Sequence, residues 1–107
     1  MIARLTGKLI EKHPGTIILQ TQGVGFEVLI SSRTFEKLPE IGEEVMLNIH
    51  THVREDEIKL IGFLNNSEKE LFLKLFNVSG ISVKIALSSL SIYSAEELKR
   101  IIANKEC

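Results

Sequence analysis

The feature that most constrains the fold is a change in hydrophobic period close to Leu64. Before this residue, apolar and polar side chains alternate with a period of two, which places one face of a strand on a core. After it, apolar residues recur at helical spacing. The pattern therefore predicts a β-rich part over residues 1–64 and a helical part over residues 65–107. Alternating runs lie at 4–9, 25–30, 45–53 and 57–60, and a short β-branched run lies at 16–21.

The β-rich part thus has five predicted strands, with turn-forming residues between the runs. The segment 31–38 begins with serine and is followed by Pro39, which predicts one or two turns of helix between the third and fourth strands. This layout is typical of a five-stranded Greek-key barrel of the OB-fold type. A five-stranded SH3-like barrel satisfies the same pattern, so the pattern alone leaves both folds open.

The helical part contains two candidate capping boxes, Ser67 with Glu70 and Ser94 with Glu97, and each predicts the start of a helix. At least three short helices are expected. Because so short a part buries little surface, we expect it to rest on the barrel, on a continuation of the chain or on another subunit. An apolar stripe predicted to be core consists of Leu71, Phe72, Leu75 and Phe76.

Between the first two of these helices, Ser79, Gly80 and Ile81 predict a tight turn, and Ser82 and Lys84 begin the next helix. A glycine lets backbone amides approach a phosphate, the helix N-terminus attracts anions, and the lysine adds a positive charge. We predict that these residues contact nucleic-acid phosphates. The same pattern also closes ordinary helix pairs, so simple helix packing is the competing interpretation.

The overall charge limits how the chain could bind nucleic acid. A formal net charge of −1 argues against coating DNA through bulk charge, so binding requires a local patch or several copies. No apolar run approaches the roughly 20 residues that span a bilayer, and no signal peptide is evident. We therefore expect a cytoplasmic protein with no membrane association. The single cysteine, Cys107, cannot form an internal disulfide.

Several short segments, taken in order and with their spacing, resemble the RuvA family of Holliday-junction-binding subunits. The resemblance covers essentially the whole chain. The segments that carry it are Met1–Gly7, Gly23–Val28, Val53–Asp56, Gly62–Phe63, Glu70–Phe72, and Gly80 with Lys84–Leu87.

This resemblance implies an OB-fold domain over residues 1–64 and a helix–hairpin–helix domain over residues 65–107. It implies a homotetramer that presents a flat basic face to four-way junction DNA. In the family this subunit is not itself an ATPase: it positions the junction for a hexameric ATPase motor, RuvB, and a junction resolvase, RuvC, can join. We therefore expect a non-enzymatic scaffold without a cofactor.

The resemblance also gives a role to Glu55 and Asp56, which match acidic residues near the four-fold axis in the family. A ring of negative charge there would repel phosphates and guide the strands outward. From composition alone, the segment 54–57 is an ordinary solvated turn. Whether Arg54 holds this turn through a carboxylate or faces DNA stays open.

The chain departs from the family pattern in its hairpin and in its length. The family usually has glycine where this chain has Ser82 and proline where it has Val83. Serine can cap the next helix and donate to a phosphate, but it adds a side chain where the backbone must come close. The chain also stops at Cys107, before the family's second hairpin and C-terminal domain. We expect a fragment with weakened DNA binding and no direct recruitment of the motor.

The sequence disfavours two other kinds of site, a metal centre and a catalytic pair of carboxylates. His50 and His52 lie two apart on one strand, but no third metal ligand accompanies them in the sequence. Carboxylates on an exposed turn lack the enclosing pocket that tunes catalytic pairs. We predict no metal site and no catalytic residue.

Two further functions stay open. A generic OB-fold module for single-stranded nucleic acid needs exposed aromatic rings for base stacking. Tyr93 lies in the helical part, and Phe26 and Phe35 are predicted to be buried, which disfavours that function. An oligomerisation module, in which the helices only pack, is the other possibility.

Overall fold

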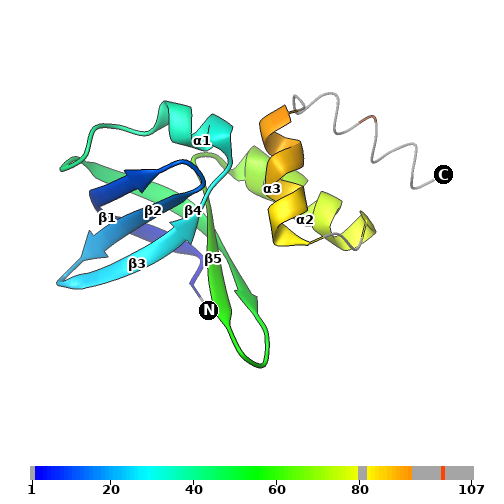
Figure 1. The fold of residues 1–107 in the computed structure, drawn as a ribbon, viewed down its shortest axis with the longest axis horizontal. Helices are drawn as coiled ribbons and strands as arrows, with labels where there is room; N and C mark the ends of the chain where they lie inside the picture. Colours follow the sequence, from blue (N-terminus) through cyan, green and yellow to red (C-terminus); the bar gives the residue numbers. More distant parts are fainter. Residues whose placement is uncertain (1, 80–81, 93–99, 101–107) are drawn as a thin grey trace.

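A computed structural model describes residues 2–79, 82–92 and 100 of the chain. Five strands form a closed barrel in the order β1-β2-β3-β5-β4, and helices α2 and α3 lie beside it (Figure 1). The predicted OB-fold barrel followed by a helical region is confirmed. The elements are β1 (Arg4–His13), β2 (Thr16–Thr21), β3 (Val24–Leu29), α1 (Ser32–Lys37), β4 (Glu44–Val53), β5 (Ile58–Phe63), α2 (Asn66–Ser79) and α3 (Val83–Ile92).

The barrel closes because β1 pairs with both of its neighbours. Its first half is antiparallel to β4 and its second half is antiparallel to β2, with a register shift between Leu9 and Glu11. Such an irregularity increases bend and twist, which a closed barrel needs. The remaining seam is parallel and short, with β3 and β5 paired at Val28↔Leu60 and at the next residue of each strand.

Alternating apolar side chains fill the barrel, and one glycine is required by their packing. A Cβ atom added to Gly62 would lie 2.6 Å from Val28 Cγ1 and 2.9 Å from Leu47 Cδ1. The buried members of this core are Leu5, Leu9, Ile17, Leu19, Val28, Ile30, Leu38, Leu47, Ile49 and Leu60.

The short helix α1 follows the sequence prediction. Ser31 is its N-cap, and the Ser31 side chain accepts a hydrogen bond from the Thr34 amide over 3.2 Å. Serine is favoured at this place because its oxygen satisfies an amide that the helix leaves unpaired.

The start of α2 corrects the sequence prediction. We expected Ser67 at the N-cap of a capping box with Glu70, but the helix begins at Asn66 and the Glu68 amide donates to Asn65 Oδ1 over 2.8 Å. Asparagine caps a helix as well as serine does, and Asn65 with Glu68 has the same spacing. Glu70 accepts instead from the Asn66 side chain over 3.2 Å.

The helices share a second core with the barrel. Phe63 of β5 lies 5.2 Å from the Phe72 ring, measured between ring centroids. Within the predicted stripe, Leu71, Phe72 and Leu75 are buried and Phe76 is half-buried. The helices therefore pack directly on the barrel. No helix in the part of the chain that the structure describes has the length and apolar character needed to cross a bilayer. The second predicted capping box, Ser94 with Glu97, lies outside the described residues.

Candidate nucleic-acid interface

The predicted phosphate contacts begin at the end of α2 and continue into α3. Ser79 is the last residue of α2, and Gly80 and Ile81 lie outside the described residues. Ser82 precedes α3, and its Oγ accepts from the Ile85 amide over 3.2 Å. This is the N-cap role predicted for serine. A hydroxyl that accepts from an amide keeps its own proton for donation to another acceptor.

The amphipathic pattern of α3 directs Lys84 to solvent. Val83, Ala86, Leu87 and Leu90 are buried against α2 and the barrel, whereas Lys84 is exposed. No acidic residue occupies the first turn of α3, although the positive end of a helix favours acids there. A lysine at this place opposes the helix dipole, and an external anion would relieve that repulsion.

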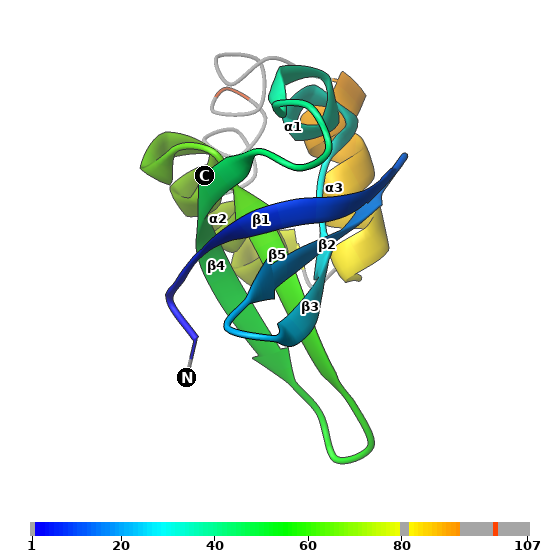
Figure 2. The same ribbon diagram turned by 90° about the vertical axis from the view of Figure 1, so that its left-hand side faces the viewer.

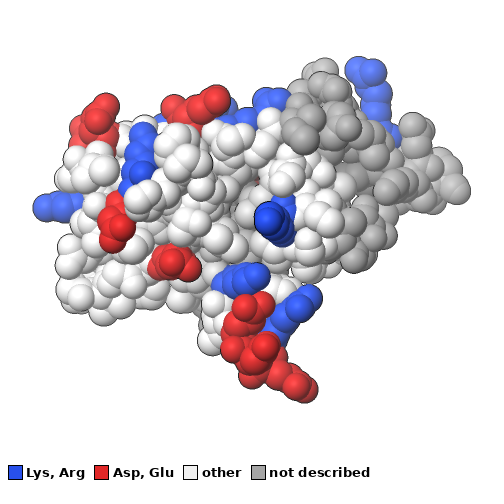
Figure 3. All heavy atoms as spheres, in the orientation of Figure 1, with Lys and Arg blue, Asp and Glu red and all other residues white. Residues whose placement is uncertain are grey.

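The second predicted feature, Glu55 and Asp56, lies at the tip of the β4–β5 hairpin. The Arg54 amide donates to the Glu57 carbonyl over 2.8 Å and narrows the turn. Figure 3 shows a dense cluster of acidic side chains at this tip, which projects away from the barrel (Figure 2). Glu55 and Asp56 are both exposed, and water screens the repulsion between their neighbouring charges.

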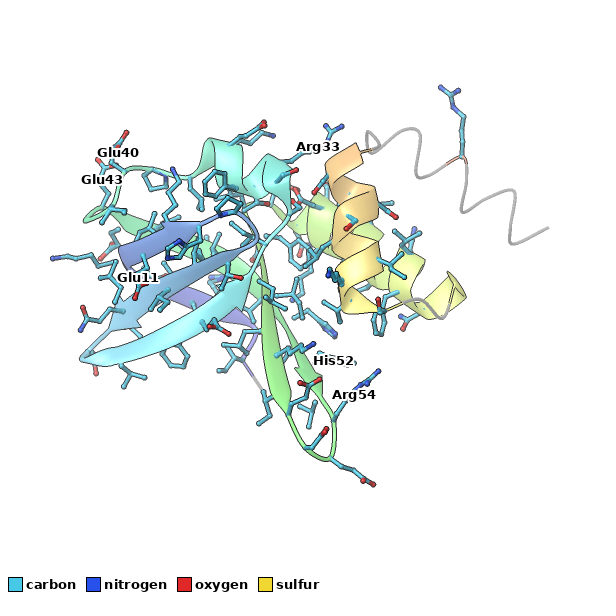
Figure 4. The ribbon with its side chains drawn as sticks, viewed as in Figure 1. Glu11, Arg33, Glu40, Glu43, His52 and Arg54 are labelled. Atoms are coloured by element: carbon cyan, nitrogen blue, oxygen red, sulfur yellow. The ribbon has the colours of Figure 1, made fainter. Side chains whose placement is uncertain are left out.

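Arg54 extends from the hairpin on the side where the helices lie (Figure 4). Among the described residues, the ion pair at this hairpin joins Lys59 Nζ to Glu57 Oε1 over 3.5 Å, and it does not involve Arg54. Two roles were left open for Arg54, holding the turn through a carboxylate or facing DNA. Within the described part of the chain, no ion pair supports the first role.

The two predicted features project to the same side of the molecule. In Figures 1 and 2 the N-terminal end of α3 and the tip of the β4–β5 hairpin both point downward. By contrast, Glu11, Glu40 and Glu43 gather at the end of the barrel that lies away from the helices (Figure 4). One side of the molecule thus carries both a cation at a helix terminus and an acidic projection.

A cleft of about 440 Å³ lies between the barrel and α3, and we call it the α3 cleft. Its wall includes Leu29, Val83 and Leu87, and two lysines line it from separate elements, Lys59 of β5 and Lys84 of α3. Sequence reasoning missed Lys59. Its alternation with Leu60 indicates an outward position, but nothing in the sequence indicates that Lys59 and Lys84 line the same cleft.

Polar contacts fix the helices on the barrel, and sequence reasoning missed these as well. Glu68 Oε1 of α2 accepts from the Ser31 and Thr34 hydroxyls, each over 3.0 Å. Ser91 of α3 accepts from the Ser32 amide over 2.9 Å. Both helices are therefore bonded to the N-terminal turn of α1, which limits how far α3, the helix that carries Lys84, can move relative to the barrel.

The two strand histidines pack against aromatic rings of α2. The His52 ring lies edge-on to Phe76 at 5.4 Å, and the His50 ring lies 5.9 Å from Phe72. Within the described residues there is no group of three or more metal-ligating side chains. Burial lowers the pKa of His50 below its ordinary value, and the charges of His52 and Lys69 lower it further.

The aromatic residues on the barrel differ in part from the sequence prediction. Phe26 and Phe35 are half-buried rather than fully buried, and the Lys12 ammonium lies 5.2 Å from the centroid of the Phe35 ring. Tyr93 lies outside the described residues. Phe26 lines a second cleft of about 440 Å³ beside the β3–β5 seam.

The family model described as the RuvA N-terminal domain matches residues 1–62. The chain belongs to this family. The RuvA resemblance inferred from short segments is thereby confirmed.

Its relatives carry the name Holliday junction branch migration complex subunit RuvA. The Solibacter usitatus relative is 51% identical over 98 residues, which make up 92% of this chain and 50% of that protein. The relative from Geobacter sulfurreducens is 50% identical over 102 residues, covering 95% of this chain and 51% of that protein. A relative from Neisseria meningitidis serogroup C is 44% identical over 106 residues, covering 99% of this chain and 55% of that protein. The chain thus spans about half the length of these RuvA proteins.

Proposed function

We propose that the chain is a non-catalytic DNA-binding subunit that holds four-way junctions during branch migration. The observation that carries this proposal is the exposed Lys84 in the first turn of a serine-capped helix, on the side toward which an acidic hairpin projects. Membership of the RuvA family supports it.

In this proposal Ser79, Gly80, Ile81, Ser82 and Lys84 contact backbone phosphates. Backbone amides and the helix terminus orient the phosphate, and Lys84 supplies a point charge, so binding is independent of base sequence. Residues 65–107 act as the gripping domain and residues 1–64 as the barrel that carries it.

The acidic residues Glu55 and Asp56 act by repulsion in the same proposal. Several copies of the hairpin around a junction would place negative charge where the strands cross, and phosphates would be directed outward into the arms. A homotetramer has the symmetry of four arms. The ATP-driven motor is then a separate protein, RuvB, and the resolvase RuvC acts on the held junction.

The test compares wild type and Lys84→Ala for binding to a synthetic four-way junction over a series of salt concentrations. Each neutralised phosphate contributes about 0.9 to the slope of log affinity against log salt. We expect Lys84→Ala to weaken binding and to lower this slope by about one for each subunit bound. Lys8→Ala, which removes an exposed lysine of β1 that lines neither cleft, is the matched control. Equal affinity and slope in both variants would contradict the assigned role of Lys84.

A further inference from the structure

Two lysines that are distant in sequence line the α3 cleft from the two elements that enclose it. Lys59 lies on β5 of the barrel and Lys84 lies on α3, and the cleft between these elements has a volume of about 440 Å³. Lys59 and the α3 residues Val83, Lys84 and Leu87 border the same cleft, so the fold brings the two lysine side chains to one space. The cleft therefore carries positive charge from both parts of the chain.

The charges around this cleft favour an anion. The lining residues of the α3 cleft in the described part of the chain include both lysines and no carboxylate. The second cleft also contains Lys59, but there Glu27 accompanies it. Two cations that line one cleft repel each other, and an anion bound between them is attracted to both. Of the two clefts, the α3 cleft is thus the one suited to an anionic ligand.

The position of the cleft relates it to the proposed DNA contact. Figure 3 shows basic side chains on the face that lies between α3 and the acidic hairpin tip. A strand gripped at Lys84 and directed away from Glu55 and Asp56 would cross this face.

We propose that Lys59 is a second phosphate contact, which binds the backbone of the same DNA arm that Lys84 holds. This inference rests on the proposed function. The apolar wall formed by Leu29, Val83 and Leu87 suits the deoxyribose between phosphates, whereas a free phosphate ion would leave that wall without a partner. Lys59 thereby extends the grip from the helical hairpin onto the barrel.

Without DNA, Lys59 has an internal partner that a phosphate must replace. Its Nζ lies 3.5 Å from Glu57 Oε1, and the two side chains are 42% and 43% exposed. Solvent-exposed ion pairs of this kind contribute little to stability, so a non-bridging phosphate oxygen displaces Glu57 at small cost. Glu57 then competes with DNA for Lys59.

The first experiment measures junction binding by Lys59→Ala and Lys59→Gln across a salt series, with Lys84→Ala and Lys8→Ala measured in parallel. We expect several-fold weaker binding for both Lys59 variants and a salt slope lower by about one per bound subunit. Lys59→Gln keeps most of the stem, so a defect common to both variants arises from the lost charge and not from lost packing.

The outcomes separate this inference from the function on which it rests. If Lys84→Ala weakens binding while both Lys59 variants behave like Lys8→Ala, the role of Lys59 is wrong and the proposed function stands. If wild type does not bind the junction, both are wrong.

A second experiment tests the competition with Glu57. Glu57→Gln should tighten junction binding in the wild-type background, because it releases Lys59 and removes a negative charge near DNA. In the Lys59→Ala background the same change should tighten binding less, since there is no lysine to release. Equal tightening in both backgrounds would show that Glu57 acts only through general repulsion, which would contradict the coupling.

Discussion

Ser31 and Glu68 join the barrel to the helical region through a hydrogen bond of 3.0 Å from Ser31 Oγ to Glu68 Oε1. The same oxygen accepts from Thr34 Oγ1, also over 3.0 Å. Ser31 and Thr34 are 1% exposed, so neither hydroxyl can turn to water if the carboxylate is removed. This contact holds α2 at a set place on the barrel.

Glu68→Ala should therefore destabilise the chain. An unsatisfied buried hydroxyl costs about 1–3 kcal/mol, and we expect a loss in this range in urea unfolding monitored by circular dichroism. Glu68→Gln keeps an acceptor oxygen and should lose less. Glu70→Ala, on the exposed side of α2, is the control and should change stability by less than about 0.5 kcal/mol. Equal losses at the two sites would contradict the joining role of Glu68.

The histidine contact predicts a dependence of stability on pH. Burial, His52 and Lys69 lower the pKa of His50 in the folded chain below its ordinary value of about 6.5. Between these two pKa values the unfolded chain binds more protons, so stability is fully present above about pH 6.5 and is lost as the pH falls toward the folded pKa.

His50→Gln should flatten this part of the stability curve, measured by urea unfolding from pH 7.5 to pH 5.5. A curve for His50→Gln that still declines as steeply as the wild-type curve would assign the effect to other groups.

The cap of α3 predicts two different results at one position. Ser82→Ala removes the oxygen that accepts from the Ile85 amide and should cost about 1 kcal/mol, whereas Ser82→Gly should cost only a few tenths. Both variants also lose the hydroxyl as a phosphate donor. If Ser82→Gly binds the junction more tightly than wild type, close approach of the backbone matters more than that hydroxyl. Thermal unfolding and junction affinity, measured on the same samples, separate the two effects.

The acidic hairpin predicts a change in selectivity. Replacing Glu55 by Gln and Asp56 by Asn removes repulsion, so affinity for linear duplex DNA should rise and preference for the junction should fall. Glu40→Gln with Glu43→Gln removes the same charge at the other end of the barrel (Figure 4) and controls for net charge. A double variant at the tip that binds every DNA more weakly would contradict repulsion.

Much of the fold could be predicted from periodicity, because each strand and α1 is specified locally. The cap of α2 could not, since Asn65 and Ser67 are both good caps with a glutamate three residues later, and the choice depends on where β5 ends. The division at residues 64 and 65 into two domains stays a prediction.

The candidate site could be predicted only where its residues are close together in the sequence. Ser82 and Lys84 follow from a turn and a helix start. By contrast, Lys59 lines the α3 cleft with Lys84 only because the closed barrel places β5 beside α3. The bond between Ser31 and Glu68 likewise joins residues brought together by tertiary packing.

The proposed function requires that this chain recognises the four-way junction and not DNA in general. The most direct test is a competition measurement, in which a labelled junction bound to the wild-type chain is challenged with unlabelled junction or with unlabelled duplex of the same arm sequence. We predict that unlabelled junction displaces the label at much lower concentration than duplex does. Displacement by both at the same nucleotide concentration would show that the chain does not distinguish the junction from duplex DNA, which would contradict the proposed function.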